Sequence, residues 1–153
     1  MYYNNNTIVF LDGKWVKASE TTSSLYGQTL HYGIGVFEGI RSYKTEDGNK
    51  IFKAKEHYER LHYSARKMEI DLPYTVEELI ELSYELLDIN QLGDAYLRPL
   101  VYLGENMSLQ TEQESHVFLS AWEWGRYLGD KQLDVMTSKF QRPNPKSCFV
   151  EAK

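Results

Sequence analysis

The chain has 153 residues, of which 42% are hydrophobic and 25% charged, a composition typical of a folded protein and not of a disordered segment. Its 17 Lys and Arg against 22 Asp and Glu give a net charge of −5, which argues against a dedicated nucleic-acid binder or a basic membrane-surface helix. Cys148 is the single cysteine, which excludes an internal disulfide and a zinc site built on paired cysteines. We expect a reducing, cytoplasmic setting, because the first residues carry no targeting pattern and no apolar run could span a bilayer.

A β-hairpin is predicted close to the N-terminus. Two apolar-rich runs, Ile8–Leu11 and Lys14–Lys17, are separated by Asp12-Gly13. Asp-Gly at this spacing is a strong hairpin signal, because both central residues of the turn need a positive φ. The next stretch, Ser19–Gln28, is rich in Ser and Thr and is predicted to be a loop.

A second hairpin and a helix are predicted next. Val36–Tyr43 and Lys50–Phe52 flank a turn at Glu46–Asn49. From Lys55 the apolar residues recur at steps of three and four, which indicates an amphipathic helix. The apolar stripe of this helix consists of Tyr58, Leu61, Ala65 and Met68.

A second helix is predicted after Pro73. Thr75 and Glu78 have the spacing of a capping box, in which each side chain accepts a hydrogen bond from the other residue's backbone N–H. The buried stripe of this helix is predicted to comprise Val76, Leu79, Ile80, Ser83 and Leu87. Two β-like segments follow, Ala95–Leu103 and His116–Ala121.

The character of the chain changes after Gly125. Leu133–Phe140 is predicted to be a strand, and a strand needs a neighbour to satisfy its backbone. The predicted fold class is α+β, with a small N-terminal domain of antiparallel sheet and two helices, followed by the start of a larger β-rich C-terminal domain. The predicted boundaries are 1–122 for the small domain, 123–131 for an interdomain loop and 132–153 for the beginning of the large domain.

Several common active-site motifs are absent. The run Gly33–Gly39 resembles a dinucleotide glycine fingerprint, but it has one residue too many and leads into a strand instead of a helix. The four histidines form no zinc-protease motif, so we expect no metal, and no Gly-x-Ser-x-Gly elbow occurs. Cys148 has no histidine signature beside it and is predicted to be a small buried hydrophobic residue.

Three groups of segments carry a family resemblance when they are taken together and in order. The first is LHYGIGVFEGIR from Leu30; the second is EHYERLHYSA from Glu56 with AYLRPL from Ala95; the third is WGRYLG from Trp124 with the final EAK. At these separations the sequence resembles the branched-chain amino acid aminotransferases, in the fold-type IV group of pyridoxal-phosphate (PLP) enzymes. The resemblance covers nearly the whole chain.

The resemblance implies that PLP is held between a small N-terminal domain and a larger C-terminal domain. Lys153 matches the position of the PLP-binding lysine, and much of the large domain is expected to lie beyond it. Transamination needs an amine that forms a Schiff base with the PLP aldehyde and then moves a proton between Cα and C4′. Lysine suits both tasks, since its stem is long and its environment can make it a base. Without the resemblance, Lys153 would be expected to be an ordinary solvated residue.

Arg60 matches a position that binds the cofactor phosphate, for which a planar guanidinium is well suited. It lies on the helix face His57–Arg60–Ser64, away from the apolar stripe, where a plain surface arginine is the alternative. The resemblance implies that the substrate is contacted by Tyr32, Phe37, Tyr96, Arg98 and Tyr127. Tyr32 is expected to reach the site of a neighbouring subunit, and Phe37 to supply an apolar wall.

Tyr96 and Arg98 lie two apart on a predicted strand, so their side chains share one face. The family's pocket accepts the aliphatic side chains of leucine, isoleucine and valine as well as the carboxylate of glutamate. The resemblance implies that Arg98 receives this carboxylate; a paired structural arginine is the alternative.

The implied activity is PLP-dependent transamination between branched-chain L-amino acids and 2-oxoglutarate, by a cytoplasmic homodimer or larger homo-oligomer without nucleic-acid or membrane partners. Three other activities stay open, because such enzymes would share Lys153 and Arg60: D-amino-acid aminotransferase, R-selective amine transaminase and aminodeoxychorismate lyase. A non-catalytic interaction domain that kept the scaffold is the alternative from a different class.

Overall fold

The computed structural model describes residues 2–108, 114–125 and 132–153. Within these residues, seven strands form one antiparallel sheet in the order β2-β1-β7-β6-β4-β5, and β3 also pairs with β6. The strands are β1 (Ile8–Leu11), β2 (Lys14–Lys17), β3 (Gly35–Phe37), β4 (Ile40–Thr45), β5 (Gly48–Ile51), β6 (Ala95–Leu103) and β7 (Ser115–Glu123). The helices are α1 (Gln28–Tyr32), α2 (Ala54–Lys67) and α3 (Val76–Ile89), with a 3₁₀ turn at Ala18–Glu20. The α+β class is therefore confirmed.

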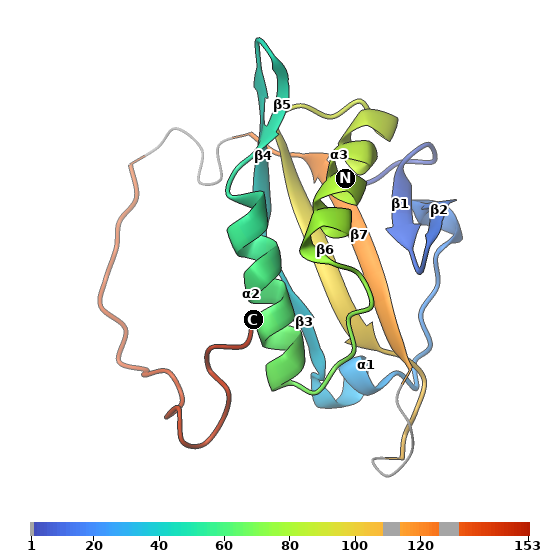
Figure 1. Cartoon of the computed structure of the whole chain (residues 1–153). Helices are drawn as coiled ribbons and strands as arrows, with labels where there is room; N and C mark the ends of the chain where they lie inside the picture. Colours follow the sequence, from blue (N-terminus) through green and yellow to red (C-terminus); the bar gives the residue numbers. More distant parts are fainter. Residues whose placement is uncertain (1, 109–113, 126–131) are drawn as a thin grey trace.

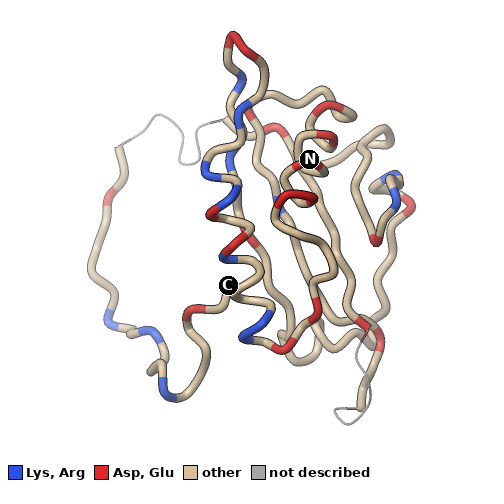
Figure 2. The backbone as a smooth tube through the Cα atoms, in the orientation of Figure 1, with Lys and Arg blue, Asp and Glu red and all other residues tan. Residues whose placement is uncertain are grey.

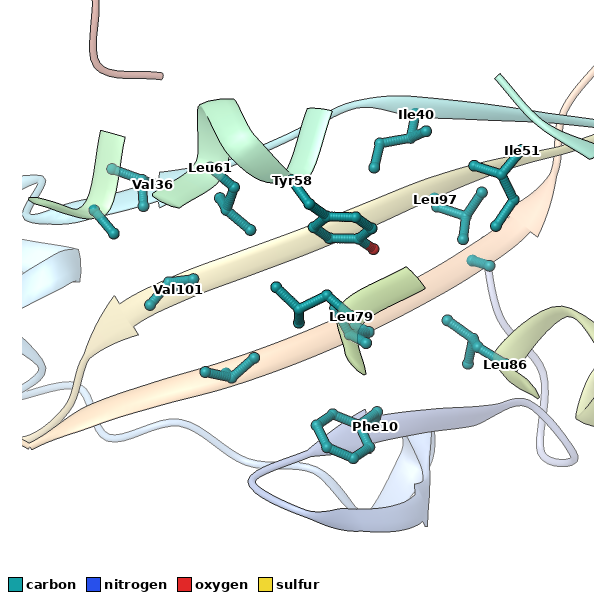
Figure 3. Packing of buried hydrophobic residues seen from close by; sticks show 14 of the residues in the cluster. Phe10, Val36, Ile40, Ile51, Tyr58, Leu61, Leu79, Leu86, Leu97 and Val101 are labelled. Atoms are coloured by element: carbon teal, nitrogen blue, oxygen red, sulfur yellow. The ribbon is translucent and has the colours of Figure 1, made fainter. Parts of the chain in front are cut away.

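The two long helices cover one face of the sheet (Figure 1). Side chains of β6 alternate between buried and half-buried, as expected for a strand with one face on the core. The core lies between that face and the helices (Figure 3). The helices contribute the fully buried Tyr58, Leu61, Leu79, Leu86 and Leu87. Burial of each such side chain stabilises the fold by about 1.5–3 kcal/mol.

Local signals in the sequence predict the first hairpin and the start of α3 correctly. Asp12 and Gly13 have φ values of 47° and 83°, the left-handed conformations that the two-residue turn requires. At α3, the Glu78 N–H donates to the Thr75 hydroxyl (3.2 Å), and the Thr75 N–H donates to the Glu78 carboxylate (2.7 Å). The capping box is therefore confirmed.

Strands β3 and β4 lie end to end along the same edge of β6 and are separated by an interruption opposite Pro99; together they are called the β3–β4 line. β3 ends at Phe37, β4 begins at Ile40, and both pair with the same edge of β6 in one register. Between them the Glu38 N–H donates to the Pro99 carbonyl (3.0 Å), but Pro99 has no N–H to return. The single strand predicted here is therefore split at Glu38 and Gly39, which puts two irregular residues at the centre of the sheet.

Three expectations are corrected by the structure. Part of the predicted loop Ser19–Gln28 is ordered as the 3₁₀ turn, and its last residue begins α1. The strand expected at Leu133–Phe140 is absent: these residues are exposed and pair with no strand among the described residues. A strand without a neighbour leaves its backbone groups unpaired, which is the physical reason. Cys148 is exposed, not buried, and no described residue in 132–153 belongs to the hydrophobic core.

Candidate active site

The last residue of the chain returns to the middle of the folded body, beside α2 (Figure 1). The Lys153 N–H donates to the Ser64 hydroxyl (3.1 Å), and the Lys153 carbonyl accepts from the Phe37 N–H (2.8 Å). The Lys153 amine donates to a carboxylate oxygen of Glu38 (3.3 Å). These three contacts fix both the backbone and the side-chain amine of Lys153.

Glu38 is the centre of this cluster, and its side chain is fully buried. It accepts two hydrogen bonds from Arg60, through Nε and through Nη2 (2.7 Å), and it also faces His57 Nδ1 (2.9 Å). Burial alone would raise the pKa of Glu38. The hydrogen bonds from Arg60 and His57, with the charges of Lys153 and Arg60, outweigh burial and lower this pKa to about 2. Glu38 is therefore ionised throughout the physiological range.

Helix α2 supplies the cationic side of the cluster. His57, Arg60 and Ser64 lie at helical spacings of three and four, so they share one face as predicted. This face is less exposed than expected: Ser64 is completely buried, whereas 47% of the Arg60 side chain is exposed. Lys and Arg gather along α2, while α3 carries only acidic charges (Figure 2). The chain as a whole is acidic, but α2 provides a local basic surface beside Lys153.

The sheet contributes a second group of predicted residues. Arg98 donates from Nη2 to the Tyr96 hydroxyl (2.8 Å), so the predicted shared face is confirmed. The Arg98 guanidinium carbon lies 4.4 Å from the centre of the Phe37 ring, and the Lys153 amine lies 5.8 Å from the same ring. Arg98 Nε is buried and has no hydrogen-bond partner among the described residues. Phe37 therefore links Lys153 to a guanidinium that has an unused donor.

Tyr96 is held in an aromatic cluster. Its ring centre lies 5.0 Å from the ring centres of both Trp122 and Trp124. Gly39 lies against the Tyr96 hydroxyl, and a Cβ at that position would overlap it. The glycine is needed here because the tyrosine approaches the backbone closely. This packing fixes the hydroxyl to which Arg98 is bonded.

Tyr32 is the predicted site residue that the described structure places outside the cluster. Tyr32 is on α1 with 47% of the residue exposed, and its ring centre is 6.1 Å from that of His31. The described contacts place it against this neighbour and solvent, not against Lys153. Tyr127 lies outside the described residues.

Glu38 is not among the site residues predicted from the sequence. It lies between Val36 and Ile40 at alternate positions, so it occupies the core-facing side of the β3–β4 line. A carboxylate in an apolar alternation needs a buried partner, and this signal was available in the sequence.

The sequence of the chain matches a known protein family. Residues 35–153 match the family model described as amino-transferase class IV. The chain is 38% identical over 152 residues to the branched-chain-amino-acid aminotransferase of Pseudomonas aeruginosa, covering 95% of this chain and 50% of that protein. It therefore spans about half the length of the curated relatives it matches.

Solved structures agree in fold. The Escherichia coli branched-chain amino acid aminotransferase has a TM-score of 0.86 at 32% identity, over 92% of this chain and 48% of that one. The Thermobaculum terrenum branched-chain amino acid aminotransferase, solved in its PLP form, has a TM-score of 0.80 at 25% identity, over 94% and 49%. Since the family model covers Glu38, Arg60, Arg98 and Lys153, the residues that form the cluster, this chain belongs to the class IV aminotransferases.

Proposed function

We propose that the protein containing this chain is a PLP-dependent aminotransferase that exchanges an amino group between leucine, isoleucine or valine and 2-oxoglutarate. One observation carries the proposal: the Lys153 amine lies beside Glu38, Arg60 and the Phe37–Arg98 pair, in a chain 38% identical to a branched-chain aminotransferase. Residues 132–153 would then open a second domain, and residues 123–131 would join it to the first.

The residues present fit an anionic cofactor. Lys153 and Arg60 contact the carboxylate of Glu38, and Arg98 lies against the Phe37 ring, which the Lys153 amine also faces, so three cationic side chains accompany one carboxylate within the described cluster. No hydrogen bond among the described residues uses Arg60 Nη1, and Arg98 Nε is a buried donor without a partner. Surplus positive charge and unused donors suit a phosphate and a carboxylate.

Each residue has a task that follows from its chemistry. When bound, PLP supplies an electron sink for the charge that is left at the substrate Cα after deprotonation. Lys153 would anchor the cofactor and, with its amine free, take the proton from Cα and return one to the cofactor side. Arg60 would bind the phosphate, Phe37 would pack on aliphatic side chains, and Arg98 would bind the distal carboxylate of 2-oxoglutarate.

The substrate pocket would use both the Phe37 ring and the Arg98 guanidinium that stacks on it. An aliphatic side chain gains from apolar contact with the ring, whereas a carboxylate needs the guanidinium stacked on it. Tyr96 and Tyr32 would complete the pocket, Tyr32 from a second subunit, and Tyr127 would contribute from the loop that leads to residues 132–153.

A homodimer is part of the proposal. Apolar side chains around α1 are unusually exposed: Leu25 by 75%, Tyr26 by 63% and Leu30 by 65%. Such a patch is typical of a surface that another subunit covers. For the compartment we propose the cytoplasm, since a lone cysteine without a disulfide fits a reducing environment. In the described ranges, no helix is long and apolar enough to cross a membrane.

The test uses the full-length protein loaded with PLP. Borohydride reduction followed by peptide mapping should place the pyridoxyl group on Lys153, and Lys153→Ala should abolish that label. Lys67→Ala, which removes a nearby lysine of α2, is the matched control and should keep it. A label on another lysine only would contradict the proposed cofactor site.

The substrate class is tested by turnover. We expect L-leucine with 2-oxoglutarate to react much faster than D-alanine or aminodeoxychorismate. Preference for D-alanine would favour a D-amino-acid aminotransferase, and failure of the protein to bind PLP would favour the non-catalytic interaction domain.

A further inference from the structure

Glu38 occupies a position where the fold favours an apolar side chain. Its neighbours on the same face of the β3–β4 line, Val36 and Ile40, belong to the hydrophobic core, and all three residues are at most 1% exposed. An isolated ionised carboxylate there would lose several kcal/mol of hydration free energy. The loss is offset only by charged hydrogen-bond donors, so the packing of this carboxylate specifies where those donors must lie.

The principal donor is Arg60. Its guanidinium uses Nε and one N–H of Nη2 to bind the two oxygens of Glu38, a two-point contact that fixes both the distance and the plane of the group. Almost half of the Arg60 side chain is exposed, and a long exposed arginine without such a contact samples many rotamers. The Nη1 group, which no described hydrogen bond uses, is therefore held in one direction by Glu38.

His57 supports the same carboxylate. Ionised Glu38 can only accept, so the proton of this contact (2.9 Å) lies on His57 Nδ1. With Nδ1 donating to Glu38, the nearby Arg60 Nη2, which also only donates, forms no hydrogen bond with this nitrogen. Glu38 is thus the acceptor that both side chains of α2 share, and it is the group that sets their directions.

We propose that Glu38 is a positioning residue for the cofactor phosphate: it orients the Arg60 guanidinium so that the remaining N–H groups of Arg60 meet that phosphate. The inference rests on the proposed function, because it presumes a phosphorylated cofactor beside Arg60. Glu38 does not bind the phosphate itself, since both groups are anions and repel each other.

The direction in which phosphate binding changes when the Glu38 charge is removed tests the proposal. Direct repulsion between two anions means that removing the Glu38 charge should strengthen phosphate binding. Loss of orientation means that removing it should weaken phosphate binding. The proposal requires the second effect to exceed the first, and it requires most of the effect on phosphate binding to pass through Arg60.

The experiment measures PLP affinity of the full-length apoprotein for the wild type, Glu38→Gln, Arg60→Met and the double variant. We expect Arg60→Met to weaken PLP binding about thirtyfold and Glu38→Gln about tenfold, as loss and misplacement of a charge-assisted contact predict. In the Arg60→Met background, Glu38→Gln should change the affinity less than about twofold, because the residue through which it acts is absent.

Pyridoxal, which lacks the phosphate, separates positioning from general damage to the site. Glu38→Gln should weaken pyridoxal binding clearly less than PLP binding, since the contact between Glu38 and Lys153 serves both ligands whereas Arg60 has no phosphate to meet in pyridoxal. Asp12→Asn is the matched control: Asp12 also accepts from a histidine Nδ1 (2.7 Å, His116), but it lies on the β1–β2 turn, and PLP affinity should not change. If Glu38→Gln does not fold, Glu38→Asp keeps the charge but shortens the side chain, and it should weaken PLP binding several-fold.

Equal losses for PLP and pyridoxal, or equal losses with and without Arg60, would overturn the proposal and make Glu38 a structural residue only. Tighter PLP binding in Glu38→Gln, or unchanged binding in Glu38→Asp, would overturn it too. Failure of the proposed function looks different: the wild type itself would not bind PLP through Lys153.

Discussion

Substitution of Arg98 by methionine tests how one pocket accepts both an aliphatic side chain and a carboxylate. Methionine keeps the length and the apolar stem of Arg98 but removes its charge. In the part of the chain that the structure describes, this guanidinium donates once to Tyr96 and stacks on Phe37 at 4.4 Å. The terminal N–H groups of Arg98 that do not donate to Tyr96 would bind a substrate carboxylate, and leucine has no group that needs them.

The magnitude follows from these contacts. Loss of the stacking on Phe37, about 0.5–1 kcal/mol, is common to both half-reactions because it is a contact within the protein that is present before either substrate binds. Loss of the charged hydrogen bond affects 2-oxoglutarate alone and leaves its carboxylate unpaired, which costs about 2 kcal/mol. Since about 1.4 kcal/mol corresponds to a factor of ten, kcat/KM should fall about thirtyfold more for 2-oxoglutarate than for leucine.

The assay measures the two half-reactions separately by single-turnover absorbance of the bound cofactor. Arg41→Met is the matched control, because Arg41 pairs with Tyr96 across the strands but donates to the Trp124 and Gly125 carbonyls (2.6 and 3.1 Å). It should change both half-reactions by one common factor. Equal losses in Arg98→Met would refute the reasoning and assign Arg98 a structural role.

Three further predictions follow from the described residues. Gly39→Ala should displace the Tyr96 hydroxyl, destabilise the protein by about 1–3 kcal/mol and raise the KM for 2-oxoglutarate; an unchanged KM would contradict the close packing. Stability from Glu38, up to about 3 kcal/mol, should be complete above its unfolded pKa of about 4.5 and be lost as the pH falls toward 2, because the unfolded state binds the proton more tightly. Urea unfolding of the apoprotein between pH 5 and 3 checks this, and Glu38→Gln should flatten that dependence. Leu30→Asp should shift the full-length protein from dimer to monomer in light scattering, whereas Leu133→Asp should not.

The elements predicted correctly from the sequence are those whose signals are local. The Asp12-Gly13 turn and the Thr75 capping box each depend on a few adjacent residues, and both occur in the structure. Helix α1 has five residues, too few for a hydrophobic period, and is held by distant contacts. The Thr29 hydroxyl accepts from the Leu103 N–H (2.8 Å), and the Gln28 N–H donates to the Gly104 carbonyl (2.9 Å). None of these partners can be identified from residues near α1 in the sequence.

The site shows the same division between local signals and distant contacts. The family resemblance indicates Lys153, Arg60 and Arg98 as site residues one at a time. From the sequence alone, each could equally be an ordinary solvated or paired side chain. What distinguishes them is convergence: Lys153 and Arg60 share the carboxylate of Glu38, and Lys153 and Arg98 share the Phe37 ring. A buried carboxylate must have cationic partners, so Glu38 in an apolar alternation already requires that cations from elsewhere in the chain meet at this strand. The sequence does not show which cations do so, because α2 and the last residue approach β3 only in the folded chain.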